Sequence, residues 1–379
     1  MKKLLLVLAA CVAALALPGQ ARAIGQCGVP SSGALWIDFG TPALERVFTR
    51  PGLILGVSTG EFPARLRSAG VKTVYWDMHL NRRIGTPSAP ADPGLIRDRA
   101  NRLFDFAAVQ SGCEKPLIAL NELFGSHLET PWTATNARYR ENVLVLLRTL
   151  AERGARPFLL VSRLPFTEGE AADWWREAAK YADLVREVYF GAPSLYKLGP
   201  IVASRRLRTA MRRSVEAFTE IGIPASKVGI VLGFQTARGK GGREGLEPSQ
   251  AWFEVVKWQA LAARQIAVET GIASVWSWGW ASYSAAAQDP DKEAAACVYL
   301  WARNPSLCDG PAVAGPGFRD SRTEGQIRLP AGRQCGFARG RIDAGALAAL
   351  QRLTGDRDVA LTELLALIAE SPLHRVRTG

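Results

Sequence analysis

Short apolar runs bounded by Gly, Pro or charged residues recur along the chain, and longer segments with apolar residues at helical spacing follow most of them. Runs of this length are typical of buried strands, whereas the longer segments are typical of amphipathic helices. The pattern predicts eight strands, over residues 34–39, 52–57, 72–78, 116–122, 157–162, 186–190, 227–234 and 274–280. Helices are predicted over residues 91–109, 135–153, 168–182, 200–221, 248–270 and 291–302, with short ones after the first two strands.

The order of these elements decides the fold class. Eight strand-then-helix units in about 270 residues match the size and order of an α/β protein of the (β/α)8 TIM barrel type. An open, doubly wound sheet is the alternative, but no Gly-x-Gly-x-x-Gly turn follows an early strand. We therefore predict a TIM barrel over residues 24–310.

Both ends of the chain differ from this pattern. The first residues carry two lysines, an apolar stretch and an Ala-x-Ala end, which together predict a secretory signal peptide cleaved after Ala23. An alternative uses Cys11 as the anchor of a lipoprotein. Residues 311–379 start with a linker rich in Gly and Pro and end in a short, mainly helical tail. We expect a secreted or envelope-associated protein with no transmembrane segment in its mature chain.

Composition and charge bear on the partner. The chain is 48% hydrophobic and 22% charged, which allows a large core and excludes disorder for most of its length. Its formal net charge is +12, and loss of residues 1–23 would remove three basic residues and leave +9. Such a surplus favours anionic surroundings such as cell-wall polymers, acidic glycans or lipid headgroups, or it only keeps the surface solvated. No basic helix or aromatic-basic motif predicts nucleic-acid binding.

The cysteines predict disulfides in an exported protein. Cys297 and Cys308 would close a short loop at the end of a helix, and Cys27 and Cys113 form the second predicted pair. Cys335 is then left over. The chain has no Cys-x-x-Cys pair that would predict a zinc or redox site.

Polar and aromatic side chains gather at the predicted strand ends. In a TIM barrel the carboxyl ends of all strands converge on the site. Carboxylates beside Trp suit carbohydrate, because sugar rings offer C–H faces to indole and hydroxyls to carboxylates. The alternation of Trp276, Trp278 and Trp280 predicts that all three face one side of the last strand. The candidates at strand ends are Asp38, Glu61, Asp77, His79, Asn121, Glu122, Ser162, Arg163, Tyr189, Gln235, Trp278 and Trp280.

The Asn121-Glu122 pair that closes the fourth strand resembles the strand-four Asn-Glu of clan A glycoside hydrolases, which are retaining (β/α)8 enzymes. The resemblance implies that Glu122 is the general acid/base and that Asn121 holds a sugar 2-hydroxyl. Trp278 or Trp280 is similar to the aromatic residue that floors the sugar site after strand eight in that clan. The likeness spans residues 34–301. Its specific part is the Asn121-Glu122 dipeptide and the position of that dipeptide at the end of the fourth strand.

The seventh strand departs from that clan. The clan's nucleophile is a Glu at the end of strand seven, where this sequence has Gln235, which cannot form a glycosyl-enzyme ester. Three alternatives stay open. Asp77 could act as base or stabiliser beside Glu122, an N-acetyl group of the substrate could assist, or the chain could bind glycan without cleaving it.

The sequence gives less support to a metal site, a phosphate site or a serine nucleophile. His79 and His127 follow strands three and four, so a metal site with Asp77 and Glu122 can be drawn, but the His-x-His spacing of barrel metal hydrolases is absent. Residues 236–245 predict a mobile lid or basic rim in preference to a phosphate site. No Gly-x-Ser-x-Gly elbow supports serine catalysis. We predict no metal and no cofactor.

The sequence thus predicts an exported, glycoside-hydrolase-like barrel that acts on a polysaccharide or cell-wall glycan. Glu122 is its predicted general acid/base, and Asp77 is the partner. The residues predicted to shape the sugar site are Asn121, Asp38, His79, Tyr189, Gln235, Trp278 and Trp280. The alternative is a non-catalytic barrel that binds glycan or cell wall.

Overall fold

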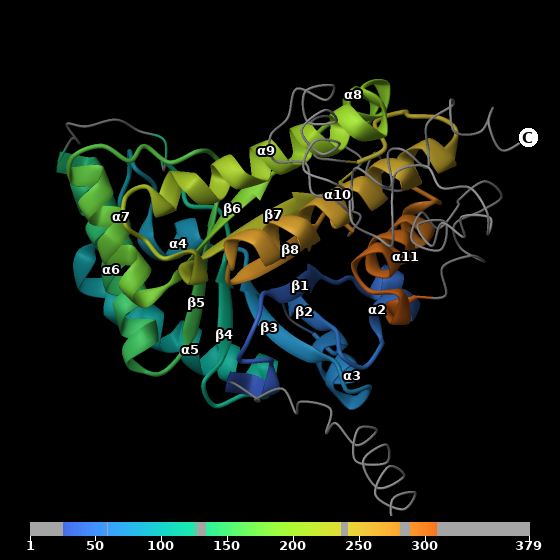
Figure 1. Cartoon of the computed structure of the whole chain (residues 1–379). Helices are drawn as coiled ribbons and strands as arrows, with labels where there is room; N and C mark the ends of the chain where they lie inside the picture. The colour runs from blue at the N-terminus through green and yellow to red at the C-terminus, as the bar shows by residue number, and fades with distance from the viewer. Residues whose placement is uncertain are drawn as a thin grey trace, which may run out of the picture.

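The protein is a closed barrel of eight parallel strands, paired in chain order from β1 to β8 and back to β1 (Figure 1). The computed structural model describes residues 26–308, apart from residues 59, 126, 128–133, 236–241 and 281–288. The predicted TIM barrel is therefore confirmed. The strands are β1 (Leu35–Phe39), β2 (Ile54–Val57), β3 (Lys72–Asp77), β4 (Leu117–Leu120), β5 (Arg156–Val161), β6 (Asp183–Val188), β7 (Val228–Gly233) and β8 (Ser274–Trp278).

Helices cover the outside of the barrel (Figure 1). The longer ones are α5 (Ile96–Ser111), α6 (Ala134–Glu152), α7 (Glu170–Tyr181), α9 (Gly199–Thr219), α10 (Ser249–Thr270) and α11 (Lys292–Arg303). The short ones are α2 (Glu45–Phe48), α3 (Phe62–Ser68), α4 (Leu80–Ile84) and α8 (Ala192–Lys197). Each long helix lies within a few residues of its predicted range, because its apolar stripe packs on the strands. The pattern missed α4 and α8, which span only one or two turns.

Two hydrophobic layers build the core. Alternate residues of each strand, such as Leu35, Ile37 and Phe39 of β1, fill the barrel interior, and the residues between them pack against the helices. The ring of Trp276 lies 5.3 Å from that of Phe39 and 5.1 Å from that of Phe158. Gly56 makes room for this layer, since a Cβ there would lie 2.7 Å from the Phe39 ring. The interior is thus packed with aromatic side chains and is no open channel.

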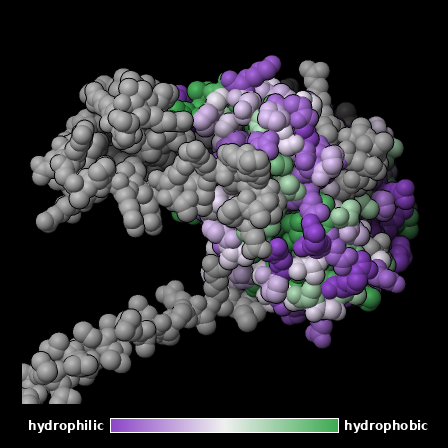
Figure 2. Space-filling view, turned by 90° about the vertical axis from the view of Figure 1, so that its right-hand side faces the viewer, coloured by the Kyte–Doolittle hydropathy of each residue, from purple (hydrophilic) through white to green (hydrophobic). Residues whose placement is uncertain are grey.

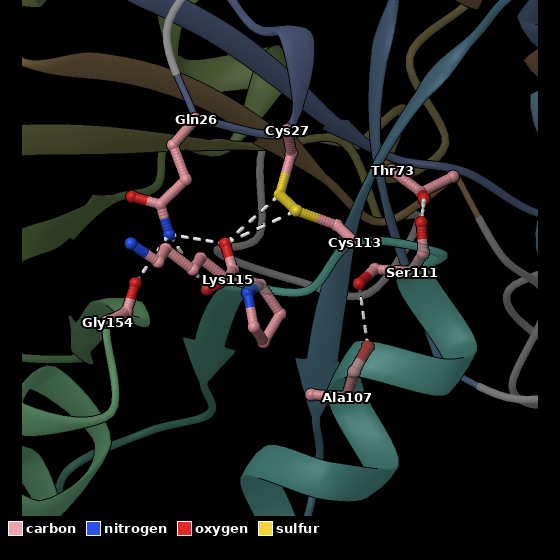
Figure 3. The surroundings of a disulfide bond; sticks show 9 residues. Gln26, Cys27, Thr73, Ala107, Ser111, Cys113, Lys115 and Gly154 are labelled. Atoms are coloured by element: carbon pink, nitrogen blue, oxygen red, sulfur yellow. Dashed lines mark hydrogen bonds between the residues drawn. A yellow bond between two sulfur atoms is a disulfide. The ribbon is translucent and has the colours of Figure 1, made fainter.

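The predicted disulfide between Cys27 and Cys113 is present and ties the start of the described chain to the end of α5 (Figure 3). Beside it, the Gln26 amide donates to the carbonyls of Lys115 and Gly154, which precede β4 and β5. Val29 follows and joins the inner core. This segment therefore closes the amino-terminal end of the barrel and leaves the carboxyl end for a site.

The second predicted disulfide, between Cys297 and Cys308, is also present and links α11 to the turn that follows it. Two disulfides fit a protein that folds in an oxidising compartment. Cys335 and the predicted linker and tail over residues 311–379 lie outside the described residues, as does the predicted signal peptide.

Two predictions at strand ends need correction. Strand β6 begins at Asp183, earlier than predicted, because the Asp183 carboxylate is paired with Arg156 and Lys227 and so tolerates burial. Trp280 does not share a face with Trp276 and Trp278. Gly279, with φ of 97°, turns the chain after β8 and sends Trp280 into the outer layer.

The described surface on the side that carries α2, α3 and α11 in Figure 1 mixes hydrophilic and hydrophobic residues (Figure 2). None of the helices within the described residues has the length and hydropathy needed to cross a membrane.

Candidate functional site

The inner faces of four strands carry polar and aromatic groups at the carboxyl end of the barrel. Leu117 and Ala119 of β4 point inward, so Asn121, two residues on, lies on the same face. Its Oδ1 accepts a hydrogen bond from the indole Nε1 of Trp76, at 3.2 Å, and Trp76 belongs to the inner core. This contact fixes the Asn121 side chain at the mouth.

Glu122 follows in an unusual backbone conformation. Its φ is 41°, in the left-handed region that costs a non-glycine residue on the order of 1 kcal/mol or more. The neighbouring hydrogen bonds hold it there, because the Asn121 amide donates to the Asp77 carbonyl at 3.0 Å and the Leu123 amide donates to the Leu160 carbonyl at 2.8 Å. Glu122 is half-buried, and its charge acts on the Tyr189 hydroxyl. The turn therefore directs this carboxylate toward the mouth.

Strand β6 supplies a second carboxylate. Val185 points inward, so Glu187 and Tyr189 continue the inner face. The Tyr189 hydroxyl is hydrogen-bonded to the Glu187 carboxylate. Burial raises the pKa of Tyr189 well above its ordinary value, and the charges of Glu187 and Glu122 raise it further. The hydroxyl thus stays protonated at neutral pH and is a hydrogen-bond donor.

Trp278, at the end of β8, completes an aromatic wall. Its ring stacks on that of Tyr189, with centroids 5.6 Å apart and planes 17° from parallel. Both residues are half-buried. Such an aromatic surface beside carboxylates and an amide is suited to a sugar ring.

Gln235 lies at the end of β7, where its position continues the inner face through Val231 and Gly233. It is half-buried beside Gly279, whose missing side chain lets the ends of β7 and β8 approach, because a Cβ there would lie 2.2 Å from the Gln235 amide nitrogen. The loop that follows Gln235 starts with residues 236–241, which lie outside the described part of the chain, so the lid or rim predicted over residues 236–245 falls largely there.

Asp77 does not point into the mouth. Tyr75 and Asp77 alternate with the inward residues Val74 and Trp76, so the Asp77 side chain faces the helices. Its two oxygens accept hydrogen bonds from Arg83 of α4, at 2.6 and 3.0 Å, and it is 1% exposed. The catalytic role predicted for Asp77 stays a prediction, while the geometry gives this carboxylate a structural partner.

Two other candidates also lie in the outer layer. Asp38 is fully buried and accepts hydrogen bonds from Ser277 at 2.7 Å and from Arg303 of α11 at 2.8 Å. Trp280 is 1% exposed, stacks on Phe234 with centroids 4.5 Å apart, and donates its N–H to the Ser277 hydroxyl. The structure does not bring either residue to the mouth.

The remaining strand-end residues lie at the rim. His79 and Arg163 are exposed, Ser162 is half-buried, and Glu61 is exposed before α3. His127 lies 3.3 Å from Arg163 through its Nε2. No group of three or more His, Cys, Asp or Glu side chains that could hold a metal occurs among the described residues, so the metal site drawn from the sequence is not assembled there.

Glu187 is the site residue that the sequence reasoning missed. Only the residues at predicted strand ends were candidates, and Glu187 lies inside the apolar run of β6. Alternation could have found it, because Tyr189 was a candidate and Glu187 lies two residues before it on the same face.

The chain is similar to several solved (β/α)8 structures. One is a chitinase from Chromobacterium violaceum, at 12% identity over 70% of this chain and 99% of that chain, with a TM-score of 0.41. Another is a glycoside hydrolase family 5 enzyme from Prevotella bryantii in complex with a xyloglucan oligosaccharide, at 11% identity over 73% and 96%, with a TM-score of 0.42. A third is a D-psicose 3-epimerase from Clostridium cellulolyticum, at 10% identity over 73% and 99%, with a TM-score of 0.40.

These identities and TM-scores are low, so the fold assignment rests on the closed strand order. No protein-family profile and no curated protein matches the chain. The chain is a (β/α)8 barrel whose structural neighbours include glycoside hydrolases and chitinases.

Proposed function

We propose that this protein is a glycoside hydrolase that acts on a polysaccharide or cell-wall glycan, with Glu122 as general acid/base. The observation that carries the proposal is the meeting of two carboxylates, Glu122 and Glu187, with the stacked rings of Tyr189 and Trp278 at the carboxyl end of the barrel. Glycosidases need a pair of carboxylates and a surface on which a sugar ring can lie.

Each side chain has a role in this mechanism. Glu122 donates its proton to the glycosidic oxygen as the bond from that oxygen to the anomeric carbon breaks. Positive charge then develops on the sugar ring, and the Glu187 carboxylate, held by Tyr189, stabilises it. Water adds to the anomeric carbon and gives its proton to the Glu122 carboxylate, which restores the acid for the next cycle. Asn121, fixed by Trp76, is placed to bind a sugar hydroxyl.

The second candidate is a barrel that binds glycan without cleaving it. It is favoured by Gln235, which stands where a nucleophilic Glu is expected, and by the pairing of Asp77 with Arg83. The lack of a Glu at position 235 is offset in part by Glu187, which supplies a second carboxylate from β6. The two functions differ in whether any glycan is cut.

We also propose that the protein is exported. The support is the signal-peptide pattern that ends at Ala23, together with the two disulfides. Replacement of the apolar stretch that precedes Ala23 should leave the protein inside the cell, which fractionation and immunoblotting would measure.

The function is tested by release of reducing ends from a panel of polysaccharides, using the wild type, Glu122→Gln and Glu187→Gln. We expect the wild type to cleave at least one glycan and both variants to lose most of that activity while they still bind it. Binding without cleavage of any polysaccharide by the wild type would support the non-catalytic barrel instead.

A further inference from the structure

A cationic cavity lies at the carboxyl end of β3, the strand that neighbours β4, and has no part in the mechanism above. It has a volume of about 280 Å³ and is lined by His79, Arg82, Arg83, Arg99 and Arg102. These residues belong to the turn after β3, to α4 and to the first two turns of α5. We call this set the arginine pocket.

The arginine pocket carries more positive than negative charge. Asp77 pairs with Arg83, and Asp98 pairs with Arg102. Within the described part of the chain, Arg82 and Arg99 pair with no carboxylate, so four guanidinium groups meet only two acids. Like charges gathered around a hollow repel one another, and an oxyanion bound among them would relieve that repulsion.

Two of the arginines are held in place before any ligand binds. Arg99 donates to the backbone carbonyls of Arg82 and Arg83, at 3.3 and 2.7 Å. The Arg83 guanidinium is fixed by its two hydrogen bonds to Asp77. Pre-positioned guanidinium groups lose little conformational entropy on binding, and their N–H groups match the oxygens of a carboxylate or sulfate.

The arginine pocket is connected to the catalytic turn. The Asp77 carboxylate binds Arg83, while the Asp77 carbonyl accepts the hydrogen bond of the Asn121 amide at 3.0 Å. Asn121 precedes Glu122, so β3 links the pocket directly to the strand that carries the general acid. The turn that carries His79 and the strand end that carries Glu122 lie at the same end of the barrel, on neighbouring strands.

From these observations we infer that the arginine pocket binds an acidic group, a carboxylate or a sulfate, of the glycan whose neighbouring sugar occupies the mouth. This inference rests on the proposed function, because it assigns an acidic class of glycan to the same site. Arg82 and Arg99 are the binding residues, since their charges are not already matched by acids.

The test is calorimetric binding to the full-length Glu122→Gln protein, which removes turnover from the measurement. The probes are a short oligogalacturonate, its neutral methyl ester, a sulfated oligosaccharide and inorganic sulfate alone. We expect an acidic oligosaccharide to bind at least about tenfold more tightly than the methyl ester, and more weakly as salt is added. The oligogalacturonate and the sulfated probe separate the two sources of the oxyanion.

Two further variants assign the effect to the arginine pocket. Arg82→Gln with Arg99→Gln should weaken binding of the acidic probe about tenfold or more. The control, Arg206→Gln with Arg213→Gln on the exposed side of α9, removes the same charge and should leave binding unchanged. If the double pocket variant folds poorly, Arg82→Gln alone serves, because the Arg82 side chain has no partner among the described residues.

Equal affinity for the acidic probes and the methyl ester would overturn the inference, as would acidic binding that survives loss of Arg82 and Arg99. These outcomes differ from a failure of the proposed function. If the wild type cleaves only neutral glycans, the pocket assignment is wrong and the proposed activity stands. If the wild type binds acidic glycans but cleaves none, the pocket assignment stands and the proposed activity is wrong.

Discussion

Tyr189 of the β6 end and Trp278 of the β8 end stack with ring centroids 5.6 Å apart and planes 17° from parallel. Two aromatic rings from different strand ends thus stack beside Glu187 and Glu122. The inner core of the barrel is filled by aliphatic side chains and by the rings of Phe39, Trp76, Phe158 and Trp276.

We expect Trp278→Ala to bind glycan more weakly than the wild type, because Trp278 and Tyr189 form the aromatic wall. Removal of the indole should weaken affinity about tenfold, or about 1.4 kcal/mol, because the sugar loses its stacking surface. Isothermal calorimetry with a cleaved or bound glycan measures the effect. The matched control is Tyr196→Ala, since Tyr196 is an exposed aromatic residue that stacks on the buried Trp258, and it should bind as the wild type does.

The buried ion pair between Asp38 and Arg303 predicts a large loss of stability in Asp38→Asn. The variant leaves the Arg303 charge buried without its partner, so the free energy of unfolding should fall by about 3 kcal/mol or more. Asp98→Asn breaks an exposed pair with Arg102 and should cost less than about 1 kcal/mol. Urea unfolding compares the two, and similar losses would contradict the structural role of Asp38.

The two disulfides should contribute unequally to stability. Cys27 and Cys113 lie 86 residues apart, whereas Cys297 and Cys308 lie 11 apart. Because a longer closed loop removes more entropy from the unfolded chain, we expect losses of about 4–5 and about 3 kcal/mol when each pair is replaced by serine. Unfolding in urea measures both, and a larger loss for the shorter loop would contradict this reasoning.

The raised pKa of Tyr75 predicts that the folded protein loses stability at alkaline pH. Burial is the main cause, and the charge of Asp77 adds to it, so that together they raise the pKa of Tyr75 from 10.0 to about 12. The unfolded chain therefore gives up the proton first as pH rises. The contribution of the Tyr75 hydroxyl to the free energy of unfolding is complete at pH values below its pKa in the unfolded chain. It is lost as the pH rises through its pKa in the folded protein.

Tyr75→Phe isolates this effect, because it keeps the ring that packs on Phe106 with centroids 5.6 Å apart. Between pH 8 and 11, the free energy of unfolding of the variant should fall by about 1 kcal/mol less than that of the wild type. Parallel falls in the two proteins would show that Tyr75 ionises normally.

The strand count was predictable from the sequence because each parallel strand is a short apolar run bounded by turns. The direction of each side chain was not. Both faces of these strands are buried, so Trp36, Ile37 and Asp38 of β1 show no polar and apolar alternation to tell the interior from the helix side. For that reason Asp38 and Asp77 were grouped with Glu122, although their side chains lie in the outer layer.

The candidate site was partly predictable. Glu122, Asn121, Tyr189 and Trp278 follow from strand ends alone, and the structure groups them at the mouth. Trp280 was misplaced because alternation was extended past Gly279, where the strand has ended. Glu187 was missed for the opposite reason, since a carboxylate inside an apolar run was not read as part of the inner face.

The central claim is that Glu122 protonates the leaving group. It is tested most directly by comparing how much activity Glu122→Gln loses on substrates whose leaving groups do and do not need a proton. The measurement is kcat/KM of wild type and variant on the cleaved glycan and on the dinitrophenyl glycoside of the same sugar, whose leaving group needs no proton. We expect a loss on the order of 100-fold or more on the glycan and a much smaller loss on the dinitrophenyl substrate. Full activity of the variant on the glycan, or equal losses on both substrates, would contradict it.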